Sequence, residues 1–109
     1  MNKPNKPLLR KWVKALESGR YKQVKNKICD ISPSKQYSYC CLGVLGRVTG
    51  LGASRMIASG GILDRKYWNK LDLGIQEEQY AFTDMNDLRG MNFKEIAGYI
   101  KNKYLKRKK

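Results

Sequence analysis

The stretch Tyr37–Gly46, YSYCCLGVLG, changes from a strand-like pattern to a helix-like pattern. Residues 36–40 and the earlier run 28–31 are β-compatible, and the sequence SPSK at 32–35 between them is typical of a turn. From Cys41 onward, apolar residues recur at helical spacing until the glycines at 50 and 52. The stretch therefore predicts a β-hairpin followed directly by a buried helix.

Two further helices are predicted near the ends of the chain. The first follows Pro7, ends near Gly19 and has an apolar face at helical spacing, formed by Leu9, Trp12, Val13 and Leu16. The last begins at Asn92, where Glu95 three residues later completes a capping-box pattern. Its apolar face consists of Phe93, Ile96, Ala97, Ile100 and Tyr104.

The middle of the chain has weaker signals. Residues 56–58 and 62–63 flank Ser59-Gly60-Gly61, which predicts a second hairpin, and bulky side chains at 67–73 are expected to cover a sheet. Residues 77–88 are expected to be helical, with acidic residues near the start. We therefore expect an α+β fold: a small single domain over residues 7–105, with three to four helices packed on a short antiparallel sheet of hairpins. A flexible basic arm (1–6) and a basic tail (106–109) would flank it.

The adjacent Cys40 and Cys41 have three alternative roles: nucleophile, metal ligand or core packing. A helix N-terminus can activate a thiol, but a cysteine hydrolase generally needs a base, and the chain has no histidine. Structural zinc needs four ligands, whereas the chain has three cysteines. Packing is favoured, with Gly43 and Gly46 allowing another element to approach the helix. We expect no catalytic residue, no metal ligand and no cofactor.

Two other patterns in the sequence have ordinary structural interpretations. Asp84 and Asp87 could share a helix face as a metal-binding or acid/base pair, but a solvated helix face is the favoured interpretation. The glycines of GRVTGLGAS at 46–54 lack the order of a phosphate-binding loop. We interpret them as a helix end and a loop.

Three segments carry a resemblance to known sequences: WVKALESGRYKQ at 12–23, YCCLGVL at 39–45 and MNDLRGMNFKEIAGYIK at 85–101. Together they resemble a group of small uncharacterised proteins from bacteriophages and actinobacteria, with the pattern W-V-x-A-L-x-S-G-x-Y, then Y-C-C-L-G-V-L, then N-D and F-x-x-I-A. Members of that group often have a further cysteine where this chain has Gly46. The resemblance implies a phage or prophage setting and no catalytic residue.

The net charge of +14 is concentrated at the two ends of the chain. Residues 1–27 carry nine basic side chains and one acidic one, residues 28–90 carry seven of each, and residues 91–109 carry seven basic and one acidic. Clustered cations bind phosphates, although a lysine-rich tail is also a common solubilising extension. The candidate nucleic-acid-binding residues are Arg20, Lys22, Lys25, Lys27, Lys101, Lys103, Lys106, Arg107, Lys108 and Lys109. Tyr21 and Tyr104 lie among these cations and could stack on unpaired bases.

These observations favour a small non-enzymatic phage-type protein that engages DNA, RNA or a nucleoprotein through its basic terminal segments. One alternative is a protein-binding inhibitor of a host nuclease or defence system, with a host nucleic-acid-binding protein as partner. A second is a thiol- or carboxylate-dependent enzyme. The N-terminus lacks a signal-peptide pattern and no apolar run is long enough to span a membrane. We therefore expect the cytoplasm of a bacterial host cell, no membrane partner and no small-molecule substrate.

Overall fold

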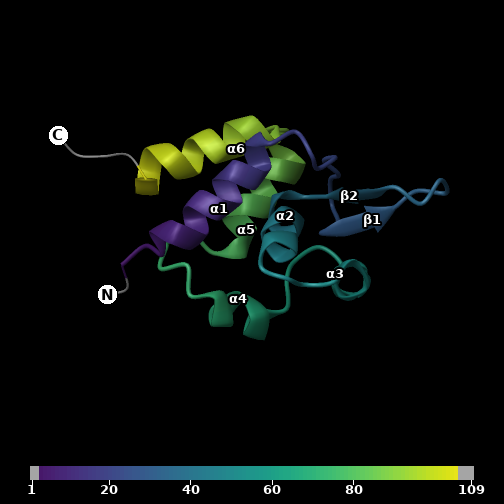
Figure 1. Cartoon of the computed structure of the whole chain (residues 1–109), viewed down its shortest axis with the longest axis horizontal. Helices are drawn as coiled ribbons and strands as arrows, with labels where there is room; N and C mark the ends of the chain where they lie inside the picture. The colour runs from purple at the N-terminus through teal and green to yellow at the C-terminus, as the bar shows by residue number, and fades with distance from the viewer. Residues whose placement is uncertain (1–2, 106–109) are drawn as a thin grey trace.

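The computed structural model describes residues 3–105, which form one small α+β domain (Figure 1). This confirms the predicted fold class. Its elements in chain order are α1 (Lys6–Glu17), β1 (Cys29–Ile31), β2 (Tyr37–Tyr39), α2 (Cys41–Val48), α3 (Ala53–Ser59), α4 (Arg65–Leu71), α5 (Gln79–Thr83), the π-helix η1 (Asp84–Leu88), α6 (Phe93–Ile100) and the π-helix η2 (Lys101–Leu105).

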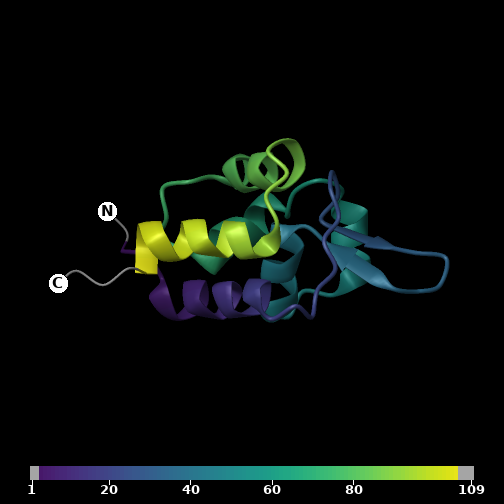
Figure 2. The ribbon, with the colours of Figure 1, turned by 90° about the horizontal axis from the view of Figure 1, so that it is seen from above.

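Helices α1 and α6 pack side by side and run in opposite directions (Figure 2). The Asn5 side chain caps α1 by accepting the Leu8 N–H at 3.3 Å. The predicted capping box between Asn92 and Glu95 begins α6. Because the two helices are antiparallel, the start of α1 and the end of η2 lie at the same end of the molecule.

Helix α2 lies at the centre of the fold, and its residues 41–46 are all buried. A Cβ atom on Gly43 would lie 2.1 Å from the Ile28 carbonyl oxygen, and one on Gly46 would lie 2.7 Å from the Met56 sulfur. The prediction that these glycines permit close approach is therefore confirmed. The Trp12 indole N–H donates to the Cys41 carbonyl at 2.8 Å, which ties α1 to the start of α2.

The predicted hairpin is present, with Cys29 opposite Tyr39 and Ile31 opposite Tyr37 in an antiparallel pair. At its root, Tyr39 donates its N–H to the Lys22 carbonyl and accepts the Val24 N–H, at 2.7 and 2.9 Å. The segment before β1 thus lies along the outer edge of β2. Beyond this root, the hairpin projects away from the helices (Figure 1).

The expected second hairpin at 56–63 is wrong, because residues 53–59 form helix α3. Met56 is its one buried residue and packs toward Gly46, so burial follows one side of a helix instead of the alternation of a strand. Gly60, with φ of 81°, ends the helix, and its carbonyl accepts the Ile28 N–H at 2.8 Å. Residues 67–71 belong to helix α4, which lies apart from the hairpin and does not cover it.

The helix expected over 77–88 begins at Gln79 and continues into η1. The fully buried Asn86 in η1 donates to the Val24 carbonyl at 2.8 Å and accepts from Gln23 at 2.8 Å. At the other end of the fold, Asn5 donates its N–H to the Leu73 carbonyl at 2.7 Å, so residues 5 and 6 are part of the domain, not of an arm. Among residues 3–105, no helix has the length and apolarity needed to cross a bilayer.

Candidate nucleic-acid interface

The exposed face of α1 is basic. The buried face of this amphipathic helix packs against α2 and α6, as its apolar period predicts. The residues between those positions therefore point to solvent, and Arg10, Lys11 and Lys14 are all exposed. Helical spacing places Arg10 and Lys14 one above the other on this surface.

A groove of about 670 Å³ lies between this face and the α6–η2 helix. Lys101 of η2 and Glu17 of α1 form an ion pair across it at 2.5 Å. Gly98 leaves open space where a side chain would stand. The lining residues are Arg10, Val13, Lys14, Glu17, Gly98, Lys101, Asn102 and Leu105. Three cations and one carboxylate therefore surround a partly apolar floor.

The groove retains uncompensated positive charge. Within residues 3–105, Glu17 is engaged by Lys101, whereas Arg10 and Lys14 take part in no ion pair. Arginine presents a planar fork of donors that matches phosphate oxygens, and lysine adds a mobile point charge. The arrangement is suited to an extended anionic backbone that lies along α1.

The predicted cations that the structure describes do not lie together in one place. Lys101 lies in the groove, whereas Lys103 binds Glu77 outside it. Lys27 pairs with Asp30 at 3.6 Å. The predicted cations before Lys27 are exposed: Arg20, Lys22 and Lys25. They belong to the segment that follows the C-terminal end of α1, which lies away from both termini (Figure 1). Lys106, Arg107, Lys108 and Lys109 lie outside the described residues.

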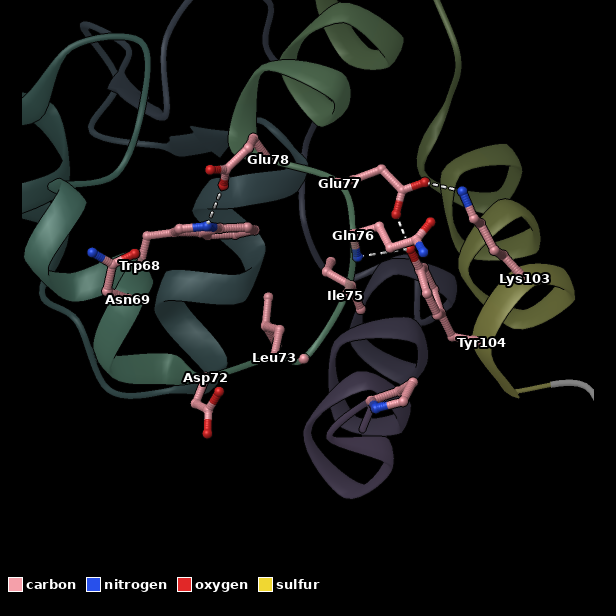
Figure 3. Close-up of a pocket in the computed structure, with 12 residues that line it drawn as sticks. Trp68, Asn69, Asp72, Leu73, Ile75, Gln76, Glu77, Glu78, Lys103 and Tyr104 are labelled. Atoms are coloured by element: carbon pink, nitrogen blue, oxygen red, sulfur yellow. Dashed lines mark hydrogen bonds and ion pairs between the residues drawn. The ribbon is translucent and has the colours of Figure 1, made fainter. Parts of the chain in front are cut away.

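A second hollow, of about 620 Å³, lies between α4, the loop at 72–78 and η2 (Figure 3). There, Glu77 accepts hydrogen bonds from Tyr99 at 2.5 Å and also from Lys103 and Tyr104. Glu78 accepts the Trp68 indole N–H at 3.3 Å. These carboxylates fasten the loop to the neighbouring helices and give the hollow an acidic rim, so it is unsuited to phosphate.

The Glu77 network shifts the pKa values of its members. Burial alone would raise the pKa of Glu77, but hydrogen bonds from Lys103 and Tyr99 outweigh it and leave that pKa lowered. The hydrogen bond to Glu77 raises the pKa of Tyr99 and of Lys103. The hydroxyl of Tyr104 is held by the same carboxylate, which fixes this half-buried tyrosine against the loop at 72–78.

The cysteines are buried. Cys40 precedes α2, and its pKa is lowered by a hydrogen bond from Cys41, against the effect of burial and with help from the N–H groups of Gly43 and Leu42. Burial raises the pKa of Cys41 well above its usual value. The exposed fractions of Cys40 and Cys41 are 1% and 0%, so neither thiol can meet a substrate without opening of the core.

The two aspartates of η1 also have structural surroundings. Asp87 accepts the Asn26 N–H at 2.9 Å and the Asn86 side-chain amide at 2.8 Å. Asp84 lines a shallow hollow of about 330 Å³ with the exposed Tyr80 and Leu88. The contacts of Asp87 hold η1 against the segment before β1 and favour a packing role.

Residues 4–50 match the model of a domain of unknown function, DUF8296. The match covers the projecting hairpin, the central helix α2 and α1, and α1 forms one side of the groove. No curated protein and no solved structure matches the chain.

The apolar period of the first helix leaves Arg10 and Lys14 on its exposed face, but neither is among the binding residues predicted from the sequence. The missing information was that Lys101, far along the chain, lies beside that face. Tyr37 is not among the predicted residues either, although its position two residues before the buried Tyr39 places both side chains on the same face of the strand.

Proposed function

We propose that this chain is a small, non-enzymatic, phage-type protein that binds nucleic acid or a nucleoprotein through the groove between α1 and η2. The observation that carries the proposal is the presence of Arg10 and Lys14, without carboxylate partners in the described part of the chain, beside Lys101. The resemblance of the sequence to small phage proteins supports a bacterial host cytoplasm as the setting.

Phosphate contacts would supply most of the affinity. Cations that neutralise phosphates release condensed counterions, and this contribution does not depend on base sequence. Binding is therefore expected to be weak at physiological salt and to tolerate many sequences. The Lys101–Glu17 pair would hold the η2 wall in place while Arg10 and Lys14 contact phosphates.

The test compares two double variants with equal loss of charge. Arg10→Gln with Lys14→Gln removes the cations of the groove, whereas Lys66→Gln with Lys70→Gln removes two exposed cations from α4, on the opposite side of the fold (Figure 1). Fluorescence anisotropy with labelled duplex DNA would be measured over a range of salt concentrations. The groove variant should bind more weakly and lower the log–log salt slope by roughly 2, at about 0.9 per phosphate. Equal effects of the two variants would refute the groove as the interface.

The basic tail needs its own variant. Changing Lys106, Arg107, Lys108 and Lys109 to glutamine leaves the apolar face of α6 intact. If the tail contributes phosphate contacts, the salt slope falls further by several units. Unchanged binding at every salt concentration would show that the tail is a solubilising extension.

An inhibitor of a host nuclease or defence complex is the second candidate. The observation that favours it is the pair of exposed apolar side chains beside the shallow hollow at η1, where Tyr80 and Leu88 are 66% and 81% exposed. Large exposed apolar residues are more typical of protein interfaces than of phosphate contacts. Salt-resistant capture of one host protein after nuclease treatment of the lysate, lost in Leu88→Ser, would support this candidate over the first.

A further inference from the structure

Three tyrosines lie together on one face at the root of the hairpin. The rings of Tyr37 and Tyr39 have centroids 6.5 Å apart and are tilted by 31°, while Tyr21 meets Tyr39 edge to face at 5.5 Å. The parallel bridge between Gln23 and Tyr39 explains this arrangement, because it aligns Tyr21 with Tyr37 on the same side of the pleat. The cluster thus depends on the backbone pairing of the hairpin root.

Burial differs sharply within the cluster. Tyr39 is 7% exposed and packs into the core, whereas Tyr37 is 44% exposed. One side of the Tyr37 ring faces Tyr39, and Ile31, directly across the strand pair, is also exposed at 41%. The core therefore holds one tyrosine rigid, and this tyrosine supports a second ring that is open to solvent on the projecting arm.

The chain around this exposed ring is basic. The predicted cations Arg20, Lys22, Lys25 and Lys27 precede β1, and Lys35 lies in the hairpin turn, all with exposed side chains. The only acidic residue in segment 20–39 is Asp30, and Lys27 pairs with it. An exposed aromatic ring on a basic segment of the chain is the combination that single-stranded nucleic acids require: a surface for a base and cations for the backbone.

We propose that the hairpin is a second contact for nucleic acid, at which an unpaired base of a single strand stacks on Tyr37 while the neighbouring lysines contact its phosphates. This inference rests on the proposed function and specifies the class of nucleic acid. Bases within a duplex are already stacked and cannot cover the tyrosine ring. The hairpin should therefore give single strands an advantage over duplex that the groove alone does not provide.

A protein strand added to the hairpin is a less suitable occupant. The N–H and C=O of Tyr39 on the outer edge of β2 already bond to the segment at 22–24. On β2, the edge left for an incoming strand is therefore limited to the outer end of a three-residue strand. The basic surroundings also favour an anionic partner. Stacking needs only the open ring face, so DNA and RNA single strands should bind alike.

The test uses the full chain with short oligothymidylate, oligouridylate and a duplex, at one low salt concentration. Tyr37→Ala should weaken binding to both single strands by about 5- to 150-fold, which corresponds to about 1 to 3 kcal/mol for one stacked base. Tyr37→Phe, which keeps the ring, should retain the wild-type affinity. Tyr37→Leu, which keeps apolar bulk without an aromatic face, should lose affinity for single strands as Tyr37→Ala does.

Two controls separate this inference from the proposed function. Tyr80→Ala removes an exposed aromatic residue of α5 that shares a shallow hollow with Asn26 but does not belong to the hairpin, and it should leave single-strand binding unchanged. Duplex binding should fall in the Arg10/Lys14 variant and stay unchanged in Tyr37→Ala. If Tyr37→Ala or Tyr37→Leu binds single strands as well as wild type does, the stacking contact is refuted and the groove remains. If the Arg10/Lys14 variant binds duplex as well as wild type does while Tyr37→Ala loses affinity for single strands, the groove is refuted and the stacking contact remains.

Discussion

Gly43→Ala tests how closely the hairpin root approaches α2. An ideal Cβ on Gly43 would lie 2.1 Å from the Ile28 carbonyl oxygen and 3.1 Å from the Tyr39 Cβ. Ordinary contacts between such atoms require about 3.5 Å. The Ile28 carbonyl must therefore withdraw by more than about 1 Å. Because this carbonyl also accepts the Cys40 N–H at 3.0 Å, the shift disturbs the bond that joins the hairpin to the start of α2.

The expected change in the free energy of unfolding has two destabilising contributions and one stabilising contribution. Overpacking a tight site costs about 1 to 3 kcal/mol, and weakening a buried hydrogen bond adds about 1 kcal/mol. Alanine regains about 1 kcal/mol over glycine within a helix. The net loss should be about 1 to 3 kcal/mol, from a total domain stability of about 5 to 15 kcal/mol.

Gly98→Ala is the matched control. It lies inside α6, where a Cβ atom meets nothing within 4 Å, so the helix gain acts alone and should stabilise the protein by about 0.5 to 1 kcal/mol. Urea unfolding followed by the fluorescence of the buried Trp12 and Trp68 would measure both variants. A Gly43→Ala protein as stable as wild type or more stable would refute the close approach, and a destabilised Gly98→Ala protein would refute the open surface.

Three further predictions concern stability and thiol burial. Glu77→Gln should lower the free energy of unfolding by about 1 to 2 kcal/mol at neutral pH. Because the pKa of Glu77 is lowered in the folded state, this difference between wild type and variant should fade as the pH drops below about 4.5. A difference that persists in acid would contradict the charged network. Trp12→Ala should cost about 3 to 5 kcal/mol, since Trp12 is fully buried against Phe82, and an unchanged thermal midpoint would show that this face lies outside the core. Cys40 and Cys41 should react with a thiol reagent only on unfolding; rapid reaction of the native protein would revive the thiol-dependent enzyme as an alternative.

The elements that sequence analysis placed correctly have strong local signals. The apolar faces of α1, α2 and α6 repeat at helical spacing, and Asn92 with Glu95 forms the capping box that the spacing predicts. Residues 53–59 have no such repeat and bury a single side chain, Met56. The choice of helix over strand there depends on packing against α2, which no local pattern records.

The amino-acid sequence by itself determined how much charge the protein carries and which face of each main helix is apolar, because both depend on residue type and local spacing. Only the tertiary structure decided which cations share a surface. The antiparallel packing of α1 on α6 brings Lys101 beside the exposed face of α1. Lys103 and Tyr104 are instead held by Glu77, and Tyr37 becomes the exposed ring of a cluster. Electrostatic and aromatic contacts depend on distances of a few ångströms between residues far apart in the chain, and those distances exist only once the core has packed.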